Sequence, residues 1–79
     1  MNNENIKAIV TNILKAIAGK KADKVLQSIE EHPNGILVYL SHGLTLGDAL
    51  DVQDEIKKAG LQIPEQMGNA VIYVTASNA

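Results

Sequence analysis

The residues best suited to chemistry lie in the segment Ser41-His42-Gly43, between an apolar run and a candidate helix start. The N-terminus of a helix favours an anion through its backbone N–H groups and dipole. Ser41, His42, Gly43 and Thr45 therefore form a candidate site for a small anionic ligand, with the His42 imidazole as phosphoryl acceptor. The alternative, which we favour, is a turn in which the glycine serves only the backbone. Successive strand side chains point to opposite faces, so Ser41 and His42 do not form a nucleophile–base pair.

The run "ILVYLSHG", residues 36–43, resembles the strand-plus-histidine signature of mannose-type sugar phosphotransferase domains. It is also similar to the histidine strand of the cobalt chelatases of tetrapyrrole synthesis. The resemblance is confined to this run, and both folds contain several strands beyond those predicted here. It implies a functional histidine, His42, at the end of a buried strand.

Other catalytic or metal-binding constellations are not visible in the sequence. His32 and His42 are the only histidines and lie in separate loops, and the chain has no cysteine, so no close metal-ligand spacing exists. We interpret His32, before Pro33, as a partner of a helix C-terminal dipole. The sequence thus predicts a protein that is not an enzyme and that carries no metal or cofactor.

Charged residues suggest two further surfaces. Asp48, Asp51 and Glu55 lie nearly in line on a predicted helix, either as a recognition stripe for a basic partner or as a solvated face. Lysines 20, 21 and 24 cluster in a predicted bend between two helices, which allows a helix-turn-helix that binds nucleic acid weakly. The net charge of −2 and the absence of arginine among the seven basic residues argue against that alternative.

Two helices are predicted before the first strand. The first spans Asn5 to Ala18, with Ile6, Val10, Ile13 and Ile17 on one apolar stripe, and Gly19 ends it. This stripe either packs on a sheet or docks a partner helix. The spacing of Ala22, Val25, Leu26 and Ile29 predicts a second helix from Ala22 to Glu31. Residues 1–33 would then be a helical hairpin, ended by the turn residues "HPNG".

Residues 35–76 predict a strand–helix–strand unit. Ile36 to Leu40 and Ala70 to Ala76 are apolar, β-branched runs typical of buried strands. Between them, Thr45 would cap a helix that ends at Gly60 and buries Leu46, Ala49, Val52, Ile56 and Ala59. Residues 61–63 could add a short edge strand, and Pro64 could begin a single helical turn. A strand–helix–strand unit of this length usually forms a right-handed parallel crossover.

The sequence therefore predicts one α+β domain, residues 1–79, with the order α-α-β-α-β and a minimal, parallel sheet packed by three helices. Two strands leave open edges and are marginal in water, although both runs are apolar nearly throughout. We expect self-association, as a homodimer, to extend the sheet. The predicted function is a small non-enzymatic interaction or regulatory module that binds another protein. With no cysteine, no signal peptide and no apolar run of about 18 residues, a cytoplasmic protein without a membrane span is expected.

Overall fold

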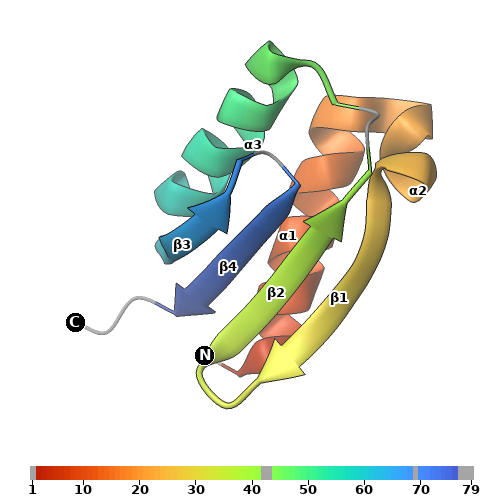
Figure 1. Cartoon of the computed structure of the whole chain (residues 1–79). Helices are drawn as coiled ribbons and strands as arrows, with labels where there is room; N and C mark the ends of the chain where they lie inside the picture. The colour runs from red at the N-terminus through yellow and green to blue at the C-terminus, as the bar shows by residue number, and fades with distance from the viewer. Residues whose placement is uncertain (1, 42–43, 69, 77–79) are drawn as a thin grey trace.

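The computed structural model describes residues 2–41, 44–68 and 70–76. It is an α+β fold with two long helices, α1 (Asn3–Ala18) and α3 (Leu46–Lys58), and a four-stranded sheet. A 3₁₀ turn, η1 (Gly19–Lys21), and a one-turn helix, α2 (Ala22–Val25), follow α1 (Figure 1). The strands are β1 (Leu26–His32), β2 (Gly35–Leu40), β3 (Leu61–Met67) and β4 (Val71–Ala76).

The sheet has the order β1-β2-β4-β3, and every neighbouring pair is antiparallel. Both long helices lie on the same side of the sheet, with α1 behind the central strands β2 and β4 (Figure 1). The molecule therefore has two layers, one helical and one of strands. We call the side of the sheet that faces away from α1 and α3 the open face.

Helix α1 ends at Ala18 as the sequence predicts, but it begins at Asn3, two residues before the predicted Asn5. The side chain of Asn2 accepts a hydrogen bond from the backbone N–H of Asn5 at 2.9 Å, which satisfies a helical N–H group that has no partner within the helix. At the other end Gly19 has a φ of 60°, a conformation that residues with a Cβ rarely adopt. On the inward stripe, Ile6 and Val10 are fully buried, so core packing accounts for them.

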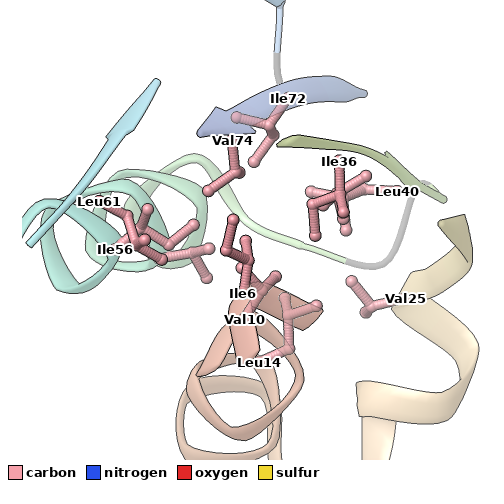
Figure 2. Close-up of a cluster of buried hydrophobic side chains, with 12 residues drawn as sticks. Ile6, Val10, Leu14, Val25, Ile36, Leu40, Ile56, Leu61, Ile72 and Val74 are labelled. Atoms are coloured by element: carbon pink, nitrogen blue, oxygen red, sulfur yellow. The ribbon is translucent and has the colours of Figure 1, made fainter. Parts of the chain in front are cut away.

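The hydrophobic core lies between the helices and the inward face of the sheet. Most of its side chains come from α1 and α3 on one side and from alternate residues of β2 and β4 on the other, and Val25 of α2 and Leu61 of β3 complete it (Figure 2). Ile36, Val38, Ile72 and Val74 are no more than 2% exposed. Because strand side chains alternate between faces, the intervening residues of β2 and β4 point to the open face.

The second predicted helix is wrong beyond its first turn. Only Ala22–Val25 is helical, and Leu26–His32 is instead strand β1, which pairs with β2 through a hairpin turn at Pro33 and Asn34. Leu26 pairs with Leu40 and Ile29 with Val38, so both face the helices although they are three residues apart. A β-bulge between Leu26 and Ser28 inserts the extra residue, and this gives the strand an apolar spacing that imitates a helix.

The predicted parallel pairing of the two apolar runs is also wrong, because β2 and β4 are antiparallel neighbours. Since β4 is antiparallel to both β2 and β3, strands β2 and β3 run in the same direction. The helical crossover thus connects β2 to β3, and β4 then inserts between them. The sequence predicts the crossover but pairs its strands incorrectly.

Strand β3 confirms and extends the short edge strand that was considered for residues 61–63. Pro64 does not begin a helical turn; it lies inside β3 where the register with β4 shifts, between Gln62 and Glu65. Proline has no N–H group to donate to a neighbouring strand, and edge strands and bulges tolerate this loss. An extra residue at that point also protects the edge from pairing with other chains.

Helix α3 begins as predicted: the Thr45 hydroxyl oxygen accepts a hydrogen bond from the backbone N–H of Asp48 at 3.1 Å. Ala49, Val52 and Ile56 are buried, as expected. The inward face is narrower than predicted, because Leu46 is 66% exposed and Ala59 follows the last helical residue on the surface. A helix can present only part of its circumference to the neighbouring layer. Leu46 and Ala59, the first and last residues of the predicted apolar stripe, therefore lie outside the contact between α3 and the rest of the core.

We predict that Gly35→Ala destabilises the fold and that Gly47→Ala does not. A Cβ at Gly35 would lie 2.2 Å from the carbonyl oxygen of Val74, which is backbone of the paired strand and cannot move aside. The expected loss is roughly 1–3 kcal/mol of unfolding free energy, the usual effect of overpacking. At Gly47, in the first turn of α3, the nearest atom is 4.0 Å away, so alanine should stabilise by about 0.5–1 kcal/mol. Urea unfolding of both variants tests this, and equal stability of Gly35→Ala and wild type would contradict it.

Candidate functional site

The open face carries three rows of side chains that run across the four strands. The register of the strand pairs places them, because residues directly opposite each other in antiparallel strands share a face. The first row, which we call the glutamate row, consists of Glu30, Leu37, Tyr73 and Glu65. The second, the tyrosine–methionine row, consists of Ser28, Tyr39, Val71 and Met67, and the third, the polar row, of His32, Gly35, Thr75 and Gln62.

The centre of the open face is apolar. Leu37 pairs with Tyr73, and Tyr39 pairs with Val71, so these four side chains form a compact block on the two central strands, which we call the apolar block. All four are half-buried, and Met67 beside them is 75% exposed. These five residues, with Glu65 and Gln66, line a shallow hollow on the surface. No described element of the chain covers it.

Charge is divided between the two layers. All seven lysines lie on the helices and the 3₁₀ turn: Lys7, Lys15, Lys20, Lys21, Lys24, Lys57 and Lys58. The strands contain no Asp, Lys or Arg, and their three glutamates are Glu30, Glu31 and Glu65. Glu31 faces the helices, where its carboxylate lies 4.0 Å from the Lys7 ammonium. Glu30 and Glu65 are exposed at opposite ends of the glutamate row, so the apolar block has a carboxylate on each side.

Glu30 is the centre of a small polar network at the β1 edge. Its carboxylate accepts a hydrogen bond from the Tyr39 hydroxyl at 3.3 Å and lies 3.1 Å from Nε2 of His32. Desolvation of the hydroxyl, and then the charge and hydrogen bond of Glu30, raise the pKa of Tyr39. A phenol is protonated at neutral pH even at the ordinary pKa of 10.0, so the Tyr39 hydroxyl donates to Glu30 there and orients the ring toward the β1 edge.

His32 is not the partner of a helix C-terminus that the sequence suggested, because it lies on β1 at the end of the polar row. Its ring meets the edge of Tyr73, two strands away, with the ring centroids 6.1 Å apart. Gly35 lies between His32 and Thr75 in the row and has no side chain to separate them. His32, Leu37, Glu65 and Tyr73 line a second shallow hollow, so the imidazole borders the apolar block.

The candidate anion site is only partly within the described residues, since His42 and Gly43 lie outside them. The Ser41 hydroxyl donates to the carbonyl oxygen of Lys24, and the Ser41 N–H donates to the Val25 carbonyl at 2.7 Å. The Thr45 oxygen accepts from the N–H of Asp48. Both side chains thus complete helix ends, Ser41 at α2 and Thr45 at α3; the choice between an anion site and a turn depends on His42 and Gly43 and stays a prediction.

The other predicted surface residues lie on the helical layer. Asp51 and Glu55 are exposed on α3, and Glu55 approaches Lys58 at 3.4 Å; Asp48 is half-buried in the first turn. On α1, Ile13 and Ile17 are half-buried against the core, so together with the buried Ile6 and Val10 they leave little accessible stripe for a partner helix.

Lysines 20, 21 and 24 are exposed. The helix pair that the nucleic-acid alternative requires is not formed, because α2 is a single turn followed by β1.

Local patterns in the sequence do not predict the open face, although they contain a signal for it. The runs Ile36 to Leu40 and Ala70 to Ala76 are apolar at nearly every position, so both faces of each strand are apolar. The structure buries one side and leaves Leu37, Tyr39, Val71 and Tyr73 on the other. The glutamates could not be placed beside them without the position of β1, which was predicted as a helix.

Comparison of the chain with models of protein families, with curated proteins and with solved structures found no match. In residues 2–41, 44–68 and 70–76, no cluster of three His, Cys, Asp or Glu side chains is arranged to hold a metal ion. No helix in this described part has the length and apolar character needed to cross a membrane. The open face is therefore assigned on geometry alone.

We predict that Glu30→Gln lowers the pKa of Tyr39 toward the ordinary value of 10.0, because the nearby negative charge is removed. The Tyr73→Phe background leaves Tyr39 as the only tyrosine, so its ionisation can be followed by ultraviolet absorbance. The pKa of Tyr39 is higher in the folded state than in the unfolded chain. The contribution of protonated Tyr39 to the free energy of unfolding is therefore complete below pH 10, and it is lost as the pH rises through the pKa of the folded state. Glu65→Gln, at the opposite edge, is the control and should leave Tyr39 unchanged; an equal response to both substitutions would contradict the assignment.

A second prediction concerns Ser41. Ser41→Ala should lower the unfolding free energy by roughly 0.5–1.5 kcal/mol, because the Lys24 carbonyl loses its donor. Ser28→Ala, an exposed serine on β1, should change stability by less than about 0.5 kcal/mol. Thermal unfolding with and without inorganic phosphate tests the alternative. A phosphate-dependent rise in Tm that disappears in Ser41→Ala would assign this hydroxyl to an anion site instead.

Proposed function

We propose that this protein is a non-enzymatic interaction module and that the open face of its sheet binds another protein. The observation that carries the proposal is the apolar block. Leu37, Tyr39, Val71 and Tyr73 lie together on the central strands, on the side that α1 and α3 do not cover. A contiguous apolar patch with a polar rim is typical of protein-binding surfaces.

The composition of the block supports this function. Tyrosine is enriched among residues that dominate binding energy, since it offers a large rigid area and a polar hydroxyl. The chain contains only two tyrosines, and both lie in the block. Met67, exposed and flexible, borders it and can adapt to the shape of a partner. A partner that covers the block would remove this apolar surface from water and turn two layers into three.

Self-association remains a prediction, but its original reason has changed. The chain supplies four strands by itself, so a second copy is not needed to complete a sheet of two. A homodimer would now use the open face, and it would bring two copies each of Glu30 and Glu65 into one interface. We therefore favour a different protein as the partner, in a cytoplasmic setting as the sequence suggested.

Site-specific photo-cross-linking tests this proposal. A photoreactive phenylalanine at position 37 or 73 should give adducts with a partner protein in cells, whereas the same residue at position 12, on the exposed side of α1, should not. Mass spectrometry then identifies the adduct for purification. Adducts formed equally from position 12, or none from the open face, would contradict the proposal, and adducts between two copies of this chain would establish self-association instead.

The purified partner allows a matched pair of substitutions. Leu37→Ser, in the apolar block, should weaken binding by roughly thirtyfold, the effect of removing one dominant contact. Leu50→Ser on α3, where Leu50 is 52% exposed, should change affinity by less than about twofold. Urea unfolding confirms that both variants are folded, and titration calorimetry measures the affinities. Equal losses from both substitutions would place the interface elsewhere.

A further inference from the structure

We infer that the partner segment seated on the open face is a basic amphipathic helix, with an apolar stripe flanked on both sides by Lys or Arg. The inference rests on the proposed function and specifies the chemistry of the partner. It depends on the glutamate row, in which Leu37 and Tyr73 lie between Glu30 and Glu65.

The first argument is the spacing of charge across the sheet. Glu30 is on β1 and Glu65 is on β3, the two edge strands of the sheet. Neighbouring strands are about 4.8 Å apart, so three spacings separate the two backbones by about 14 Å. A helix with its side chains is about 10–12 Å wide. A helix lying along β2 and β4 therefore rests on the apolar block, and cationic side chains on its flanks reach one carboxylate on each side.

The second argument is the sign of the surface. The four strands carry no Lys or Arg, and Glu30 and Glu65 are both exposed on the open face. Attraction for a partner with cations on its flanks is therefore opposed by no fixed positive charge on this face. The only basic side chain in the three rows is that of His32, and its Nε2 lies 3.1 Å from the Glu30 carboxylate. The tyrosine rings add to the preference, since the face of an aromatic ring attracts ammonium and guanidinium groups.

The third argument is the order already present in the site. The Tyr39 hydroxyl donates to Glu30 at 3.3 Å, and the ring of Tyr73 lies in a T-shaped arrangement with His32, so both rings have partners before binding that favour their orientation. Rings fixed before binding lose little conformational freedom when a partner arrives. The same charge pattern disfavours the other occupants: a nucleic acid would bring phosphates against two glutamates, and a second copy would bring four carboxylates together.

Synthetic peptides test the inference with the full chain. We would compare a helical peptide with a leucine stripe flanked by lysines, the same peptide with every lysine replaced by glutamate, and a scrambled peptide of the first composition. Isotope-labelled protein is titrated and followed by NMR. The basic amphipathic peptide should bind and shift the backbone signals of Leu37, Tyr39, Val71 and Tyr73, while the acidic and scrambled peptides should bind at least about tenfold more weakly.

A charge-matched pair of variants tests the role of the glutamates. Glu30→Gln with Glu65→Gln should weaken binding of the basic peptide at least about tenfold at low salt and reduce its salt dependence. Asp51→Asn with Asp54→Asn makes the same charge change on α3, in the other layer, and should alter affinity less than about twofold. Thermal unfolding verifies that both double variants are folded.

The outcomes separate this inference from the proposed function. If cross-linking finds a partner at positions 37 and 73 but the peptides bind without regard to charge, or not at all, the basic helix is refuted and the interaction module stands. If neither experiment gives binding at the open face, both proposals fail. Sedimentation equilibrium tests self-association. If the protein is a dimer and Leu37→Glu dissociates it, a second copy of this chain covers the open face, and the inference is overturned.

Discussion

The pairing of β2 with β4 is the constraint on which the rest of the structure depends. The two most apolar segments of the chain become the central strands, and their register places Ile36 beside Val74 on one face and Leu37 beside Tyr73 on the other. Within the described residues of this 79-residue chain, α1 and α3 are the only long helices, and both pack on the inward face. One side of the central strands is thus fully enclosed, and the other must either remain wet or be covered from outside.

The outer strands determine the chemistry of the uncovered side. Strands β1 and β3 each carry one glutamate to the open face, at the level of Leu37 and Tyr73. Their bulges also deform both edges, and β3 contains a proline at its irregularity. Edges that are deformed in this way resist pairing with further strands. The sheet is therefore better suited to contact through its face than through its edges.

Much of the fold follows from local patterns in the sequence, and the largest error, the second helix, has an identifiable physical cause. Helix α1, the cap at Thr45, both central strands and the presence of a helical crossover were predictable from periodicity and capping residues. A bulge in β1 placed Leu26 and Ile29 on one face at a helix-like spacing. A regular strand turns every second side chain to the same face. The extra residue of the bulge changes this spacing from two residues to three, and only the pairing of β1 with β2 shows that the segment is a strand.

The same errors explain why the candidate site moved. Local periodicity places Glu30 and His32 on a helix, without relation to Leu37 and Tyr73, so the local motif at Ser41 and His42 is the strongest site signal in the sequence. Pairings between distant segments assemble the open face, whereas the Ser41 segment is contiguous in sequence. Local motifs are visible in one sequence, but a surface built from four strands requires their order and register.

The apolar block is not required to make a sheet. The polar row occupies the same face of the same four strands and contains His32, Gly35, Thr75 and Gln62, so this face tolerates polar and small side chains. Cross-strand apolar pairs contribute about 0.2–1 kcal/mol each, and threonine pairs also stabilise strands. Substituting the block would leave Ile36, Val38, Ile72 and Val74 in place against the helices, because they point the other way. Stability alone therefore does not account for an apolar block that holds both tyrosines and sets Leu37 and Tyr73 between two glutamates, whereas a partner with a complementary surface does.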